Sequence, residues 1–199
     1  MARRIACVVE GHGDLEAVPI VVRRIAEHIQ PPVIVQVTAP LRTPRSKLVK
    51  PGELERAVEF AARRIGAGGV LIVLDSDDDC PATIGPALLA RAESVRNGFP
   101  IAVILAKSEF ESWFVAAAES LAGIAGLPLG LQAPADPESI RGAKEWLTAS
   151  MLGTRSYSPT LDQPVLARQF DLASACRADS FEKFHRETER LLSEAPDVW

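Results

Sequence analysis

The chain has 199 residues, and 22 Lys and Arg against 26 Asp and Glu give it a formal net charge of −4. Its 47% hydrophobic and 24% charged residues are ordinary for a globular protein, which excludes disorder of the whole chain. No apolar run approaches the ~18 residues of a membrane span, and the apolar stretch after Arg3 and Arg4 is too short for a signal peptide. We therefore expect a cytoplasmic protein with no membrane partner.

The cysteines do not indicate a disulfide scaffold or a zinc site. Cys7, Cys80 and Cys176 are odd in number and no two of them have CxxC spacing. Cys7 stands in an apolar run and is predicted to be a core residue. Cys80 follows an acidic run, which we expect to disfavour its thiolate, so a catalytic cysteine is not predicted.

Apolar runs alternate with helical periods along the first half of the chain. Residues 4–9 and 33–37 are predicted strands, and apolar residues at helical spacing over 18–29 predict a helix between them. Pro31 and Pro32 end that helix because proline lacks the amide donor. The proline-containing segment 38–50 carries several Arg and Lys residues and is predicted to be a basic loop. A helix is expected from Pro51 to residue 65.

The next two strands are apolar on both faces. They are predicted over 70–74 and 101–105, with helices over 86–96 and 113–121 after them. Strands of this kind, separated by helices, indicate an α/β fold with a parallel sheet that is covered on both sides. After residue 126 only helices are predicted, over 136–147, 163–176 and 179–192. We therefore expect an α/β core over 1–125 and a helical extension over 126–199 that packs on it.

Acidic residues follow three of the four predicted strands. Ligands of parallel α/β sheets bind at the carboxyl ends of the strands, where these side chains converge. Carboxylates held together repel one another, and a divalent cation with a preference for oxygen ligands, Mg²⁺ or Mn²⁺, relieves the repulsion. The alternative is that each acid caps the next helix or lies in a solvated turn. The acids are Glu10 after the first strand, Asp75 and Asp77 after the third, and Glu109 and Glu111 after the fourth.

These residues resemble the pattern of the Toprim family. The family has Glu-Gly at the end of its first strand, an acid on the next helix, and Asp-x-Asp after a later strand; here these are Val9-Glu10-Gly11, Glu16 and Leu74-Asp75-Ser76-Asp77. Lys107-Ser108-Glu109-Phe110-Glu111 resembles the third acidic motif of the overcoming-lysogenization-defect type nucleases. The stretch from Tyr157 to Phe184 is similar to small stand-alone Toprim-like proteins of unknown function, some of them encoded beside ATPases in prokaryotic defence or mobile loci.

The resemblance implies a Toprim-like, Rossmann-like sheet of about four strands and a Mg²⁺- or Mn²⁺-dependent nuclease that acts on DNA or RNA. His12-Gly13-Asp14-Leu15 departs from relatives, which have a shorter stretch ending in Thr-Glu, so either Asp14 or Glu16 is the second acid. Either Glu109 or Glu111 faces inward. Carried over by position, Glu10 binds metal or transfers a proton, and the remaining metal ligands are Glu16, Asp75, Asp77, Glu109 and Glu111.

Other features of the sequence have a functional and a simpler structural explanation. Lys107 either neutralises a phosphate in catalysis or forms a salt bridge with a nearby carboxylate. Gly11-His12-Gly13 lacks the third glycine of a dinucleotide fingerprint, and the chain has no P-loop. Trp113, Phe114 and Trp146 are predicted to be core residues and not platforms for base stacking. The competing function is a non-catalytic Toprim-like module that binds a partner ATPase or nucleic acid.

Overall fold

A parallel β-sheet forms the centre of the computed structural model, which describes residues 2–66 and 68–194. Its main strands have the order β2-β1-β4-β5, the short strand β3 also pairs with β1, and every pairing is parallel. The predicted α/β fold with a parallel sheet is therefore confirmed. The strands are β1 (Ala2–Val9), β2 (Ile34–Val37), β3 (Leu41–Arg42), β4 (Gly69–Asp75) and β5 (Ile101–Ala106).

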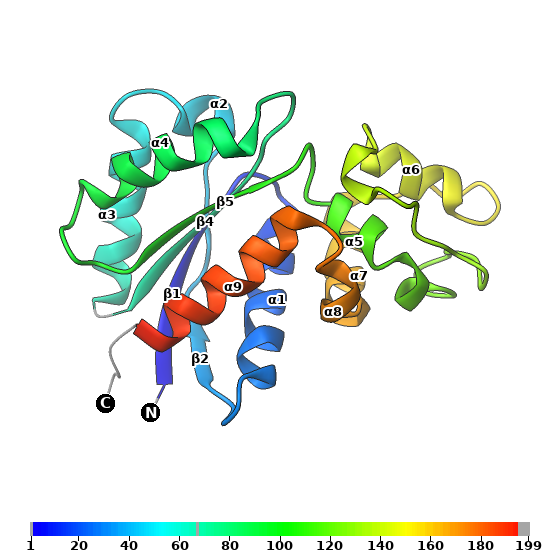
Figure 1. Cartoon of the computed structure of the whole chain (residues 1–199), viewed down its shortest axis with the longest axis horizontal. Coiled ribbons are helices and arrows are strands. Elements are labelled where there is room, and N and C mark those ends of the chain that lie inside the picture. Colours follow the sequence, from blue (N-terminus) through cyan, green and yellow to red (C-terminus); the bar gives the residue numbers. More distant parts are fainter. Residues whose placement is uncertain (1, 67, 195–199) are drawn as a thin grey trace.

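Helices cover both faces of the sheet (Figure 1). α3 (Glu53–Ile65) and α4 (Pro81–Glu93) pack on one face, and α1 (Asp14–His28) and α9 (Asp179–Glu194) pack on the other. Short helices lie to one side of the sheet, at the right of Figure 1. They are α5 (Ser112–Ala116), α6 (Ala143–Ser150), α7 (Pro159–Gln169) and α8 (Leu172–Ala175), with 3₁₀ turns at Ala118–Leu121 and Pro137–Ser139.

The basic segment 38–50 is more ordered than the sequence suggested. The prediction of a loop was wrong in part, because the segment contains β3 and the one-turn helix α2 (Arg45–Leu48). Leu48 is fully buried under α3, and its burial anchors the segment to the core. The following helix begins at Glu53, since Gly52 has a left-handed φ of 80°. The helix predicted over 86–96 begins earlier, at Pro81, where the absence of an amide hydrogen has no cost.

The core is continuous from the sheet to the C-terminal helices. One cluster of buried hydrophobic side chains includes members of β1, β4, β5 and α1 together with members of α5 to α9. Trp113 and Phe114 are fully buried, as predicted, and Trp146 packs on the cluster in a partly buried position. Because the two predicted parts share this core, the structure gives no separate test of the boundary at residue 126, which stays a prediction.

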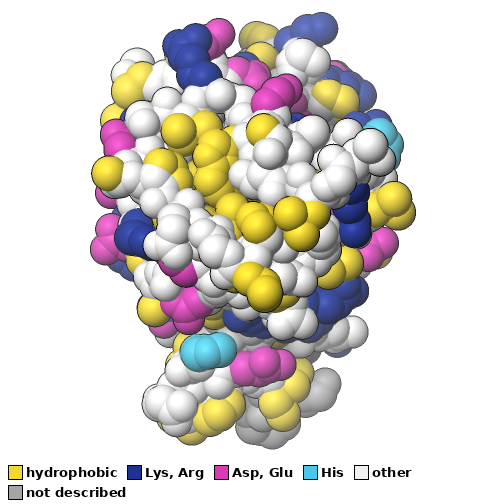
Figure 2. Space-filling view, turned by 90° about the vertical axis from the view of Figure 1, so that its right-hand side faces the viewer, with side chains coloured by type: hydrophobic (Ala, Val, Ile, Leu, Met, Phe, Trp, Pro, Cys, Tyr) yellow, Lys and Arg dark blue, Asp and Glu magenta, His cyan; other side chains and the backbone are white. Residues whose placement is uncertain are grey.

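The end of the molecule that carries α5 to α8 has an uneven surface. Figure 2 looks onto this end and shows hydrophobic side chains gathered across the middle of the face, with charged side chains toward its edges. Leu129, Leu152 and Leu161, from this part of the chain, are 88%, 63% and 71% exposed. None of the helices in the described residues is both long and apolar enough to cross a membrane.

Candidate functional site

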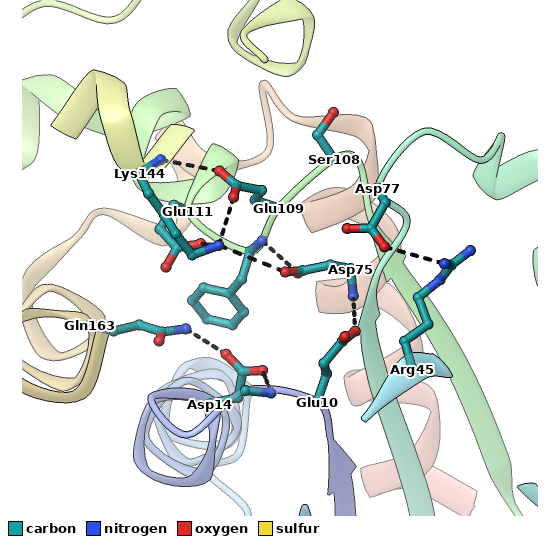
Figure 3. A network of polar contacts seen from close by, with 12 residues as sticks. Glu10, Asp14, Arg45, Asp75, Asp77, Ser108, Glu109, Glu111, Lys144 and Gln163 are labelled. Atoms are coloured by element: carbon teal, nitrogen blue, oxygen red, sulfur yellow. Dashed lines mark hydrogen bonds and ion pairs between the residues drawn. The ribbon is translucent and has the colours of Figure 1, made fainter. Parts of the chain in front are cut away.

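Glu10 and Asp75 meet where the sheet changes its direction of winding. The chain passes from β1 to β2 on one side of β1 and later returns to β4 on the other side, so the crossovers diverge between β1 and β4. Ligands of α/β sheets bind at such a point. Glu10 directly follows β1 and Asp75 ends β4, and the Glu10 carboxylate accepts a hydrogen bond of 3.3 Å from the Asp75 backbone amide. Figure 3 shows both side chains at this edge.

Lys144 joins three of the acidic side chains. It lies on α6, and its ammonium nitrogen is 2.8 Å from Glu109 Oε1, 3.0 Å from Glu111 Oε2 and 3.9 Å from Asp75 Oδ2. Its backbone amide also donates to Glu109 Oε2. The Asp75 side chain is fixed further by a 2.8 Å hydrogen bond from the Phe110 amide. Lys144 therefore ties α6 to the ends of β4 and β5 (Figure 3).

Glu111 and Asp14 complete the site from the side of α7. Tyr157 donates a 3.0 Å hydrogen bond to Glu111, whose carboxyl group is almost fully buried. Asp14 accepts one hydrogen bond from the Gly11 amide, at 2.7 Å, and another from Gln163, at 2.6 Å. These contacts hold both carboxylates in defined positions.

Gly13 permits the close approach of α7 to the loop after β1. A Cβ atom at this position would lie 1.8 Å from Gln163 Oε1 and 2.5 Å from the Pro159 carbonyl oxygen, both distances far below contact. The absence of a side chain at Gly13 therefore lets Gln163 reach Asp14.

Burial makes the site electrostatically unfavourable for so many carboxylates. Burial is the main reason why the pKa of Asp75 is raised well above its ordinary value, and Glu111, Asp14 and Glu10 raise it further. Burial also raises the pKa of Glu111 and of Glu10. For Lys144, burial lowers the pKa, but its acidic neighbours outweigh burial and leave it above the ordinary value. One ammonium group thus compensates only part of the negative charge.

A cavity of about 270 Å³ opens on this group of residues. Asp14, Asp75, Glu111 and Lys144 line it together with the loop from Gly11 to Gly13 and residues of α7. The side-chain atoms in its walls that could bind a metal ion include carboxylate oxygens, the amide oxygen of Gln163 and the imidazole of the exposed His12. Within residues 2–66 and 68–194, no three His, Cys, Asp or Glu side chains already form a group that could hold a metal ion.

The structure brings only some of the predicted site residues together. Glu10, Asp75, Glu109 and Glu111 lie in one polar network (Figure 3). Asp77 forms no hydrogen bond or ion pair with these acids: its side chain is 61% exposed and pairs with Arg45 at 3.2 Å, and its charge adds to burial in raising the pKa of Glu10. Both Glu109 and Glu111 face inward, because the residues between β5 and α5 form a turn and not a regular helix.

Glu16 and Lys107 lie outside this network. Glu16 is exposed on α1 and lines another pocket, beside Arg23. Asp14 occupies the inner position instead. Residues 14, 18, 21 and 25 share one helical face, and since Val18, Val21 and Ile25 are core residues, this spacing could have identified Asp14 as the inner acid. Lys107 is exposed, forms no ion pair with the described residues, and lines a separate, larger cavity.

Sequence reasoning missed Lys144 and Gln163. Both come from helices more than 30 residues away along the chain from the acids they contact, as in the Lys144–Glu109 pair, separated by 35 positions. No local pattern in the sequence marks either residue. Only the tertiary packing of α6 and α7 against the sheet edge places them in the site.

The comparisons with known proteins identify a family without a described activity. A family model described as a domain of unknown function (DUF4276) matches residues 9–189, which is most of the chain. Its matched range includes every acidic residue of the site. No curated protein and no solved structure matches the chain.

Proposed function

We propose that this chain, which belongs to the family described as a domain of unknown function (DUF4276), is a cytoplasmic Mg²⁺-dependent nuclease. The proposed substrate is DNA or RNA, and the proposed cofactor is Mg²⁺ or Mn²⁺. One observation supports it most: acids from three strand ends meet at the topological switch point with more negative charge than Lys144 neutralises. The resemblance of the acidic motifs to the Toprim pattern agrees with this proposal.

The residues at the site fit a hard divalent cation in chemistry. The donors are oxygen atoms, and Mg²⁺ is commonly bound by one or two carboxylates that leave several water ligands in place. Glu10, Asp75 and Asp14 are the residues that would hold it, because Glu109 and Glu111 are engaged by Lys144. A cation would relieve the burial cost that raises the pKa of Asp75 and Glu10.

Each group of the site has a role in this proposal. When bound, the metal supplies Lewis-acid polarisation of a phosphate and a more acidic water molecule. Glu10, whose carboxylate accepts a hydrogen bond from the Asp75 backbone amide, would hold the metal beside Asp75. Lys144 holds Asp75 and Glu111 in place and offers a positive charge to a phosphate oxygen.

The test is cleavage by the Asp75→Asn variant. Asn retains the acceptor for the Phe110 amide but removes the charge, so we expect at least a ~100-fold loss of metal-dependent cleavage with the fold intact. Single- and double-stranded DNA and RNA are incubated with Mg²⁺ or Mn²⁺, with EDTA as the blank. Glu93→Gln, an exposed change on α4, is the matched control and should cleave like the wild type. Equal cleavage by the wild type and Asp75→Asn would contradict the proposal.

A second candidate is the non-catalytic module that binds a partner ATPase or nucleic acid. The observation that favours it is Lys144, whose ammonium already pairs with Glu109 and Glu111 and lies 3.9 Å from Asp75 without a metal. Calorimetric titration with Mn²⁺ separates the two candidates. A nuclease site gives saturable Mn²⁺ binding that Asp75→Asn abolishes, whereas a closed ion-pair cluster gives no binding in either protein.

A further inference from the structure

A cavity larger than the one at the acidic site lies beside it and has no role in the function proposed so far. Its volume is about 700 Å³, within the range of cavities that hold small ligands. Its walls are the loop after β4 with the first turn of α4, the end of β5 with the loop after it, the turn at Glu138–Arg141, and the first turns of α9. We call it the Lys107–Lys183 cavity, after the two lysines that line it.

Two ammonium groups in this cavity form no ion pair within residues 2–66 and 68–194. Three of the acidic residues that line it are paired with arginines: Arg45 contacts Asp77 and Asp79, and Arg141 contacts Asp78 at 3.0 Å. The other two are Glu138, which accepts a hydrogen bond from the Ser180 amide, and the exposed Asp179. Lys107 and Lys183, in contrast, form no ion pair with any side chain in the described part of the chain. An anionic ligand is the partner that these two lysines lack.

The cavity also has an apolar wall, and hydrogen bonds hold the residues at its base in place. Leu105, Pro81 and Ala82 line it next to the lysines. Ser180, at the base, accepts a 2.8 Å hydrogen bond from the buried Trp113 indole and one of 3.3 Å from the Lys107 amide. Its own amide donates to the buried Glu138 carboxylate. Leu105 and Pro81 offer apolar surface to a base, and the two cations beside them offer charge to a phosphate, so the lining suits a nucleotide.

Only one turn of chain separates this cavity from the acidic site. The loops after β4 and β5 are joined there by two hydrogen bonds, from the Ser108 amide to Ser76 Oγ at 2.9 Å and from the Asp77 amide to the Ser108 carbonyl at 3.1 Å. Asp77 and Ser108 line the cavity, while Asp75, two residues before Asp77, faces the acidic site. Figure 3 shows Asp77 and Ser108 on the side of Asp75 away from Gln163.

We infer that the Lys107–Lys183 cavity binds one nucleotide of a single-stranded nucleic acid, next to the phosphodiester held at Glu10 and Asp75. The phosphate lies between the two lysines and the base lies against Leu105 and Pro81. This inference rests on the proposed function for the nature of the substrate. It adds a binding subsite that positions the strand and takes no part in bond cleavage.

Strand binding without metal tests the inference. The probes are a fluorescein-labelled 12-residue oligothymidylate and the matching oligouridylate, measured by anisotropy in EDTA. We expect Lys107→Gln and Lys183→Gln each to weaken binding about fivefold and to reduce the slope of log K against log salt by about 1. Lys50→Gln, an exposed lysine outside the cavity, is the matched control and should change affinity less than twofold. Equal weakening by all three variants, or no saturable binding by the wild type, overturns the inference.

Cys80 gives an independent readout of position. It lines the cavity and is exposed, and hydrogen bonds from Thr83 lower the pKa of its thiol, contrary to the expectation that its acidic neighbours would disfavour the thiolate. Saturating oligothymidylate should slow its reaction with N-ethylmaleimide at least fivefold, read by mass spectrometry of the peptide that contains it. Lys183→Gln at the same strand concentration should lose part of this protection. Unchanged labelling at saturation contradicts the inference.

Failure of this inference and failure of the nuclease proposal can be told apart. Glu93→Gln, an exposed change on α4 outside the cavity, should bind the strand in EDTA like the wild type. Strand binding through the lysines without any cleavage would support the subsite and contradict the nuclease proposal. Normal cleavage after both lysines are replaced would support the nuclease proposal and contradict the subsite.

Discussion

Asp75 is the residue on which the site depends most. It ends the central strand β4, and its carboxylate contacts a backbone amide on one side and the Lys144 ammonium on the other. Its pKa is raised by burial and by neighbouring acids in spite of that ammonium. Because burial and neighbouring acids disfavour its charged form, additional positive charge stabilises this side chain, which makes Asp75 a suitable contact for a cation.

Asp14 and Glu16 give a matched comparison on one helix. We expect Asp14→Asn to reduce metal-dependent cleavage strongly and to lower the free energy of unfolding by about 1–2 kcal/mol, because one of its two buried acceptors becomes a donor. Glu16→Gln should leave both quantities unchanged, since Glu16 is exposed on another face of α1. Urea unfolding and the cleavage assay check this pair. A larger loss for Glu16→Gln than for Asp14→Asn would restore Glu16 as the second acid.

Helix α6 owes its position to Lys144. The helix has only eight residues, and Gly142, with a left-handed φ of 74°, precedes it. Its attachment to the strand ends includes the backbone and side-chain contacts of Lys144 with Glu109 and the ion pair with Glu111. Leu147, which is fully buried, supplies the apolar part of the same attachment. Helix α6 therefore contributes to the stability of the fold and also supplies the positive charge of the site.

Replacement of Lys144 by Met should show this double role. The change leaves Asp75 and Glu111 without their shared cation, so we expect the free energy of unfolding at pH 7.5 to fall by about 3 kcal/mol. At pH 5 the loss should be smaller, because both carboxyl groups bind protons more readily there and need no partner. Urea unfolding at the two pH values measures this loss in the free energy of unfolding. Lys47→Met, which removes an exposed pair with Glu53, should cost less than about 1 kcal/mol at either pH.

The whole molecule combines a rigid sheet with a site that destabilises it at neutral pH. The buried strands β1, β4 and β5 and the shared hydrophobic cluster provide the stability. The raised pKa values of Glu10, Asp75 and Glu111 mean that the native state binds more protons than the unfolded state between the ordinary carboxyl pKa and the raised values. Stability therefore falls as the pH rises through that window.

The pH dependence of thermal unfolding follows from these directions. Arg96 and Arg63 lower the pKa of Glu59 to about 2, and Arg177 does the same for Glu119, so the stability from these groups is lost as the pH falls from about 4.5 toward 2. Together the two effects predict a maximum of the melting temperature near pH 5 in EDTA. Mg²⁺ should raise the melting temperature more at pH 8 than at pH 5. A melting temperature in EDTA that rises steadily from pH 5 to pH 8 would contradict the account.

The sequence predicted those strands and site residues that depend on local residue patterns. Runs such as 70–74 and 101–105 are apolar on both faces, which is typical of buried parallel strands. An acid directly after such a strand lies at the carboxyl edge of the sheet, where ligands bind, as Glu10 and Asp75 do. The resemblance to Toprim motifs also pointed to these acids, but it left the second acid open between Asp14 and Glu16. Lys144 and the Lys107–Lys183 cavity depend on how α6 and α9 pack, which no local period encodes.

We propose above all that Glu10 and Asp75 hold a divalent cation at the point between β1 and β4. The most direct measurement is the anomalous difference density of a crystal of the full chain soaked in Mn²⁺. We expect a peak within coordination distance, ~2.2 Å, of carboxylate oxygens of Asp75 and of Glu10 or Asp14, and no such peak in Asp75→Asn. Strong Mn²⁺ density elsewhere, with Lys144 still bound to Asp75 and Glu111 and no peak at Asp75, would contradict this proposal.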